Sequence, residues 1–79
     1  MTKGEYRVGI NFNPSADDRV GLIKRAAADL IDLIETIQSD RDTERGNERG
    51  RLKSLAQTAI EDGAMWAVKA ATKPAPEGK

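Results

Sequence analysis

The chain has 79 residues, enough for one small domain whose hydrophobic core adds little net stability. It contains no cysteine and no histidine, which excludes disulfides and thiolate zinc sites and removes the commonest general base and metal ligand. Thirteen basic and thirteen acidic residues cancel, so the chain lacks the broad positive field that binding to long nucleic acids requires. We expect no enzyme, no metal and no cofactor, whereas a local basic site for a small anion remains compatible with the composition.

The first predicted element is a short N-terminal arm, residues 1–14. A weak alternation of apolar side chains predicts an extended segment here: Tyr6, Val8, Ile10 and Phe12. One isolated strand is not stable alone, so we expect the arm to lie against the helices of its own chain or of a neighbouring chain. The arm lacks the features of a signal peptide, and no apolar run in the chain reaches transmembrane length, so we expect a cytoplasmic protein.

Residues 15–72 form a predicted helical hairpin domain, whose first helix spans about residues 16–38. Ser15 is the expected cap, and the acids that follow suit the positive end of the helix dipole. Apolar residues recur at spacings of three and four and predict one seam: Val20, Ile23, Ala27, Leu30, Ile34 and Ile37. Other apolar residues widen this face beyond what one antiparallel partner covers: Leu22, Ala26, Ile31 and Leu33.

A polar connection, about residues 39–50, leads into a second helix, about residues 48–72. Gly46 and Gly50 are interpreted as helix breakers within the connection. The start of the second helix stays open, because arginine and glutamate in this region also favour helices. The second helix carries a stripe of mostly small residues: Leu52, Ala56, Ala59, Gly63, Trp66 and Ala70.

The fold class that follows is all-α: a short N-terminal arm followed by an antiparallel helical hairpin. Met65 and Trp66 are predicted to be structural and to bury in the seam between the two helices, as large apolar residues on a helical stripe most often do. The apolar flanks need further helices to cover them, so we expect assembly into an oligomeric helical bundle, a dimer at least. Residues 73–79 combine prolines, a glycine and charges and are predicted to be a disordered tail.

One set of residues suits a small nucleotide ligand. An aromatic ring such as Phe12 can stack on a base, and a cation such as Lys24 or Arg25 can bind a phosphate. The residue types alone favour a simpler interpretation, in which Phe12 is a hydrophobic staple at the helix start and Lys24 is a solvated charge. Acidic pairs elsewhere indicate surface charges, so no catalytic residue is predicted.

The segment RGRLKSLAQTAIEDGAMWAVKAA, residues 49–71, resembles the C-terminal helix of a family of phage anti-defence proteins. These are the anti-CBASS sponges for cyclic oligonucleotides, whose helical hairpin also occurs in one type of Thoeris anti-defence sponge. The residues that match the family pattern are Arg51, Thr58, Ile60, Glu61, Met65, Trp66 and Ala67. Upstream, FNPS at residues 12–15 resembles the element that opens the family's first long helix, and IKRAAADLIDLI resembles that helix.

The resemblance implies a helical protomer that assembles through interlocked dimers, typically into a hexamer. It implies that cyclic dinucleotides such as cGAMP bind between protomers, that some members also hold cyclic trinucleotides at separate sites, and that the ligands stay intact. Evasion of host defence would follow, because the effector of the CBASS system is deprived of its messenger in the host cytoplasm during bacteriophage infection.

The resemblance also implies roles for individual residues. Phe12 matches an aromatic position that stacks on a base, where the family more often has tyrosine, and Asn13 is a candidate for reading a base edge. Lys24 matches the basic position that meets the phosphates, with Arg25 as the alternative if the alignment is shifted by one residue. Two further residues are candidates for a separate trinucleotide site: Arg51 and Thr58.

Two other functions remain as alternatives. A small helical-hairpin adaptor would bind another protein through its apolar flanks, and an enzyme would degrade the same messengers. The fate of a bound nucleotide separates the three, because a sponge releases it intact, an enzyme releases a linear product, and an adaptor releases none.

Overall fold

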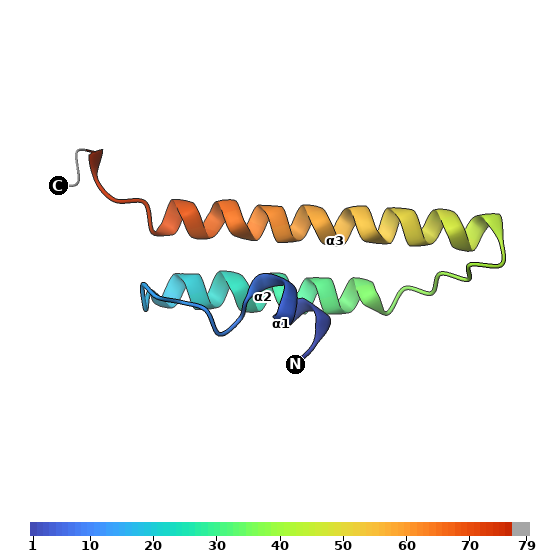
Figure 1. Ribbon diagram of the computed structural model, residues 1–79, viewed down its shortest axis with the longest axis horizontal. Helices are drawn as coiled ribbons and strands as arrows, with labels where there is room; N and C mark the ends of the chain where they lie inside the picture. The colour runs from blue at the N-terminus through green and yellow to red at the C-terminus, as the bar shows by residue number, and fades with distance from the viewer. Residues whose placement is uncertain (77–79) are drawn as a thin grey trace.

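The computed structural model describes residues 1–76, and its helices are α1 (Lys3–Val8), α2 (Asp18–Glu35) and α3 (Glu44–Ala71). Helices α2 and α3 run antiparallel side by side, and α1 packs against α2 (Figure 1). The prediction of an all-α helical hairpin is therefore confirmed for the described residues, which contain no strand. None of these helices combines the length and hydropathy of a membrane-spanning segment within residues 1–76.

The N-terminal segment is helical, which corrects the prediction of an extended arm. The Glu5 N–H donates to the Thr2 hydroxyl at 3.1 Å, and the Thr2 N–H donates to the Glu5 carboxylate at 2.8 Å, so the two residues form a capping box. Gly9 caps the C-terminus of α1, and its φ of 63° is left-handed and therefore favours glycine. These two local signals outweigh a weak apolar alternation, and Tyr6 is exposed rather than packed.

Helix α1 lies so close to α2 that only glycine fits at the contact. A Cβ added to Gly4 would overlap the main-chain carbonyl of Ala28, and the Gly4 N–H donates to the Asp32 carboxylate at 2.7 Å. Ala28 is fully buried by this approach. Gly4 therefore sets the distance between the two helices.

We expect Gly4→Ala to displace α1 from α2, because the added methyl group overlaps backbone that cannot move aside. Hydrogen exchange of the α1 amides should then approach that of an undocked helix, while the α3 amides keep their protection. Gly21→Ala is the matched control, because a Cβ at Gly21 meets no atom within 4 Å. Unchanged protection of α1 in Gly4→Ala would contradict the close approach.

Helix α2 begins later than the predicted cap. Asp17 is the N-cap, since its carboxylate accepts from the Arg19 N–H at 2.8 Å, whereas the Ser15 hydroxyl donates to the Asn13 side chain at 2.8 Å. The helix ends at Glu35, and a connection over residues 36–43 leads to α3. The expected cap at Ser15 is therefore wrong by two residues, because aspartate at the next possible cap competes with it.

The buried face of α2 departs in part from the predicted seam. Val20 and Ala27 are buried as predicted, whereas Leu30 and Ile37 of the predicted seam are exposed. The other buried residues of α2 are Lys24, Ala28 and Ile31. The difference arises because α2 packs against α1 on one side and α3 on the other. Contacts with both helices therefore determine which residues of α2 are buried.

Helix α3 begins at Glu44, four residues before the predicted start at about residue 48. The Thr43 hydroxyl caps it by accepting from the Gly46 N–H at 2.9 Å. Gly46 and Gly50 lie inside the helix, so their interpretation as breakers is wrong. Gly46 is needed for packing, because a Cβ there would overlap the main chain of Asp40 in the connection.

The inner face of α3 is one residue out of register with the predicted stripe. Gln57 and Ala64 are buried in this face. Trp66 follows Ala64 by two residues, which turns its side chain by about 200° around the helix and away from α2. Met65 and Trp66 are 56% and 60% exposed, which corrects the prediction that they bury in the hairpin seam.

The single chain is elongated. Its Cα positions extend over 56 × 24 × 13 Å, so the longest dimension is more than twice the next. The buried apolar residues are few: Val20, Ala27, Ala28, Ile31 and Ala64. Large apolar side chains are exposed along both long helices, including Leu22, Leu33, Leu52, Leu55 and Trp66. Of the predicted tail, residues 73–76 are exposed and residues 77–79 lie outside the described part of the chain.

Candidate functional site

The loop between α1 and α2 brings Phe12 and Lys24 together. The Lys24 ammonium donates to the main-chain carbonyl of Gly9 at 3.0 Å and to that of Phe12. The same ammonium nitrogen lies 5.5 Å from the centroid of the Phe12 ring, within the range of a cation–π interaction. The ring itself is 71% exposed, so one face remains available to a partner molecule.

Asn13 closes this loop onto the start of α2. Its side-chain nitrogen donates to the Asp17 carbonyl at 3.1 Å, and its side-chain oxygen accepts from the Ser15 hydroxyl at 2.8 Å. Ala16 adopts a positive φ of 53° within the same turn. In the protomer the Asn13 amide therefore holds the loop that presents Phe12.

Arg25 forms its contacts with α1 and with its own helix. Its guanidinium donates to Glu5 at 2.8 Å and to Asp29 of the next helical turn at 3.0 Å. The hydrogen bond from Arg25 and that from the Thr2 backbone lower the pKa of Glu5 from 4.5 to about 2. The two neighbouring cations thus have separate surroundings, and Lys24 is the one beside Phe12.

Tyr6 is a candidate that the sequence pattern missed. It lines the same open groove as Phe12, of about 380 Å³, together with Gly9, Ile10 and Asn11. The capping box at Thr2 and Glu5 is the signal that would have placed Tyr6 on a helix beside the loop. Two exposed aromatic rings consequently flank one surface groove.

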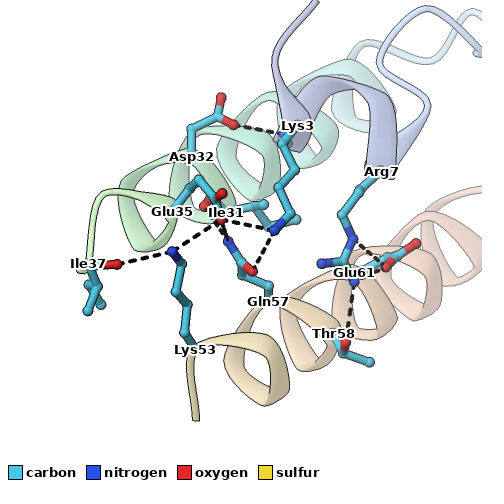
Figure 2. A network of polar contacts seen from close by, with 11 residues as sticks. Lys3, Arg7, Ile31, Asp32, Glu35, Ile37, Lys53, Gln57, Thr58 and Glu61 are labelled. Carbon is cyan, nitrogen blue, oxygen red and sulfur yellow. Dashed lines mark hydrogen bonds and ion pairs between the residues drawn. The ribbon is translucent and has the colours of Figure 1, made fainter. Parts of the chain in front are cut away.

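A polar network joins the start of α1, the end of α2 and the middle of α3 (Figure 2). Gln57 is 1% exposed, and its amide nitrogen donates to the Ile31 carbonyl at 3.1 Å and to Glu35 at 3.0 Å. Its amide oxygen accepts from the Lys3 ammonium at 3.1 Å. Lys53 donates to the Ile37 carbonyl at 3.0 Å, next to the same carboxylate. The network fixes how α1, α2 and α3 meet and thereby the position of the loop that α1 carries.

Two carboxylates of this interface make the docking of α1 sensitive to acid. Hydrogen bonds from Gln57 and Lys3 lower the pKa of Glu35 from 4.5 to about 2, as Arg25 does for Glu5. Both carboxylates have lower pKa values in the folded state, so their stabilising effect is present above pH 4.5 and is lost as the pH falls toward 2.

We therefore expect α1 to undock between pH 4.5 and about 2, before the α2–α3 hairpin unfolds. Amide exchange of residues 3–8, compared with that of α3 across this range, measures the effect. Glu35→Gln should weaken docking at neutral pH and reduce the acid dependence. Protection of α1 that persists unchanged to pH 2 would contradict the expectation.

The candidates for a second site contact different partners. The Thr58 hydroxyl accepts from the Arg7 guanidinium at 3.3 Å, and Arg7 also forms an ion pair with Glu61 (Figure 2). Arg51 binds Glu48 at 2.6 Å on the same helix. Arg51 also lines a separate cavity of about 380 Å³, whose other basic lining residues are Lys3, Arg41 and Lys53. The protomer therefore does not join Arg51 to Thr58 by a direct contact.

The fold and the site together define a small all-helical hairpin protein with an exposed aromatic ring beside a buried lysine. No group of residues within 1–76 is arranged to bind a metal ion. The model of the Acb2/Tad1 hairpin domain family matches residues 4–72, and the chain belongs to this family. No curated protein and no solved structure matched the chain. Membership confirms the resemblance to the anti-defence sponges and implies a protein that binds cyclic oligonucleotides.

Proposed function

We propose that the protein is a phage-encoded sponge that sequesters cyclic dinucleotides such as cGAMP without cleaving them and so blocks CBASS signalling in the host cytoplasm. The observation that carries the proposal is the pairing of an exposed Phe12 ring with the Lys24 ammonium, in a chain of the Acb2/Tad1 hairpin family. Base stacking and phosphate attraction are the two interactions that such a ligand requires.

The proposed site is shared between two copies of the chain. A cyclic dinucleotide has two bases and two phosphates, and a two-fold interface supplies two copies of every side chain. One Phe12 then stacks on each base, while Lys24 faces the phosphates. A stacked base contributes about 1 to 3 kcal/mol and a charged hydrogen bond about 1.5 to 3, so two of each suffice for tight binding after the cost of association.

Self-association is part of the proposal, with a dimer as the unit and a hexamer as the assembly. The exposed apolar surface supports it, because both long helices carry faces of large apolar side chains that a single chain leaves uncovered. Exposed Met65 and Trp66 lie on such a face, where a neighbouring protomer would cover them. Light scattering on the purified chain gives the mass of the assembly directly.

A separate site for cyclic trinucleotides is proposed around Arg51 and Thr58. The cavity lined by Arg51, Arg41 and Lys53 supports it, because several cations around one pocket suit a ligand with three phosphates. Thr58 lies about two helical turns from Arg51 on α3, beside Arg7. Competition between a cyclic dinucleotide and a cyclic trinucleotide distinguishes one shared site from two.

Heat extraction of a saturated complex tests the function itself. The protein is incubated with one cyclic nucleotide at a time, washed and heated, and the released nucleotide is analysed by mass spectrometry. Recovery of the intact cyclic nucleotide supports a sponge, and a linear product indicates an enzyme. No bound nucleotide from a panel of cyclic di- and trinucleotides and cyclic ADP-ribose isomers favours the adaptor, for which the exposed apolar faces would be the binding surface.

A further inference from the structure

Lys24 is a charged residue that the structure buries, with 8% of its surface exposed. A buried ammonium costs free energy unless hydrogen bonds replace its hydration. Within residues 1–76 no carboxylate forms an ion pair with Lys24, and its partners are instead the main-chain carbonyls of Gly9 and Phe12. Loop backbone therefore compensates the burial of this charge.

The loop is shaped so that its carbonyls converge on the ammonium. Gly9 turns the chain with its left-handed φ, and its carbonyl also accepts from the Phe12 N–H at 2.9 Å. The Ile10 N–H donates back to the main-chain carbonyl of Glu5 in α1 at 3.0 Å. The segment from Gly9 to Phe12 consequently folds around one point, which the Lys24 nitrogen occupies.

We propose that Lys24 is a positioning residue, whose ammonium holds the carbonyls of Gly9 and Phe12 and thereby fixes the exposed Phe12 ring. An ammonium has three donors, so one remains for an acceptor on a ligand after two are used by the loop. The consequence for ligand binding rests on the proposed function, whereas the effect on the loop is a property of the free protein. Lys24 thus acts on a ligand both through Phe12 and through its remaining donor.

The chain contains a matched comparison for this role. Lys69 lies over the Trp66 ring with its nitrogen 5.4 Å from the centroid, nearly the same geometry as Lys24 over Phe12. Lys69 is exposed, however, and its ammonium holds no main-chain carbonyl among the described hydrogen bonds. Lys69→Met therefore serves as a control for removing a lysine above an aromatic ring elsewhere on the chain.

Hydrogen exchange of the full-length protein without ligand tests the positioning role. In Lys24→Met the Phe12 amide should exchange about tenfold faster than in wild type, the factor expected from loss of about 1.4 kcal/mol of hydrogen bonding. In Lys69→Met it should exchange at the wild-type rate. If Lys24→Met fails to fold by circular dichroism, Lys24→Gln, which keeps a donor but loses the charge, is compared with Lys69→Met instead. A folded Lys24 variant whose Phe12 amide exchanges as slowly as in Lys69→Met overturns the proposal.

A double-mutant cycle in calorimetry, with 3′,3′-cGAMP as the probe, tests the consequence for binding. If Lys24 acts partly through the Phe12 ring, the losses in Lys24→Met and Phe12→Ala overlap, and the double variant binds more tightly than their product predicts. Fully multiplicative losses overturn the coupling. Absence of binding by the wild-type protein counts against the proposed ligand, while the exchange experiment still decides the positioning role.

Discussion

Phe12→Ala is expected to weaken binding of 3′,3′-cGAMP by a factor of about thirty or more while the oligomer stays intact. The reason is that a two-fold site loses two stacked bases, each contributing about 1 to 3 kcal/mol. Because the ring is exposed in the protomer, its removal leaves no cavity and little change in folding stability is expected. Calorimetry gives the affinity, and light scattering on the same samples gives the mass.

Phe12→Tyr is the matched control for this prediction. It keeps the aromatic face and adds a phenolic hydroxyl, so its affinity should equal or exceed that of wild type. Tyr6→Ala probes the other ring of the shared groove. An unchanged affinity in Phe12→Ala would remove Phe12 from the site, and a loss confined to Tyr6→Ala would transfer the stacking role to α1.

Ile31→Ala is expected to reduce the free energy of unfolding by about 2 to 5 kcal/mol, the range measured for removing large buried aliphatic groups. Ile31 is fully buried, and the protomer has few buried apolar residues, so the loss is a large part of the roughly 5 to 15 kcal/mol that stabilises a domain. Urea denaturation at several protein concentrations measures the effect and separates folding from association.

Two exposed residues provide the comparison for Ile31. Leu33→Ala on the same helix should change the stability of the dissociated chain little, and Trp66→Ala should do the same, because neither side chain is buried in the protomer. In the proposed assembly Trp66→Ala should instead shift the concentration dependence of unfolding. A loss in dissociated Trp66→Ala as large as that in Ile31→Ala would show that Trp66 belongs to the hairpin core.

Helical periodicity predicted the hairpin but not which faces meet. The spacing of apolar residues on α3 is that of a seam, yet the face that contacts α2 lies one residue further along, through Gln57 and Ala64. The apolar pattern placed the large Trp66 in the interior and gave no indication that Gln57 is buried. Gln57 fits because its partners, Ile31, Glu35 and Lys3, lie on the other two helices, and this pairing is visible only once the helices are placed.

The sequence identified two residues of the candidate site but not the contacts that they make. The resemblance named Phe12 and Lys24, and the structure brings the two together. It also shows Lys24 buried against main-chain carbonyls of the loop, which residue types alone cannot reveal, because every residue supplies the same carbonyl group. Helix α1 was missed for a different reason, since its capping box and its terminal glycine are local signals that the apolar alternation concealed.

The few buried apolar residues of the chain lie apart from the large apolar side chains that it exposes. The buried apolar residues come almost entirely from α2, while the outer side of α3 carries exposed Leu52, Leu55 and Trp66. Substitutions on that side are therefore expected to change the exposed surface with little penalty in folding. Such a division gives a short chain room to diversify its contacts quickly, because few of its surface positions are constrained by an interior.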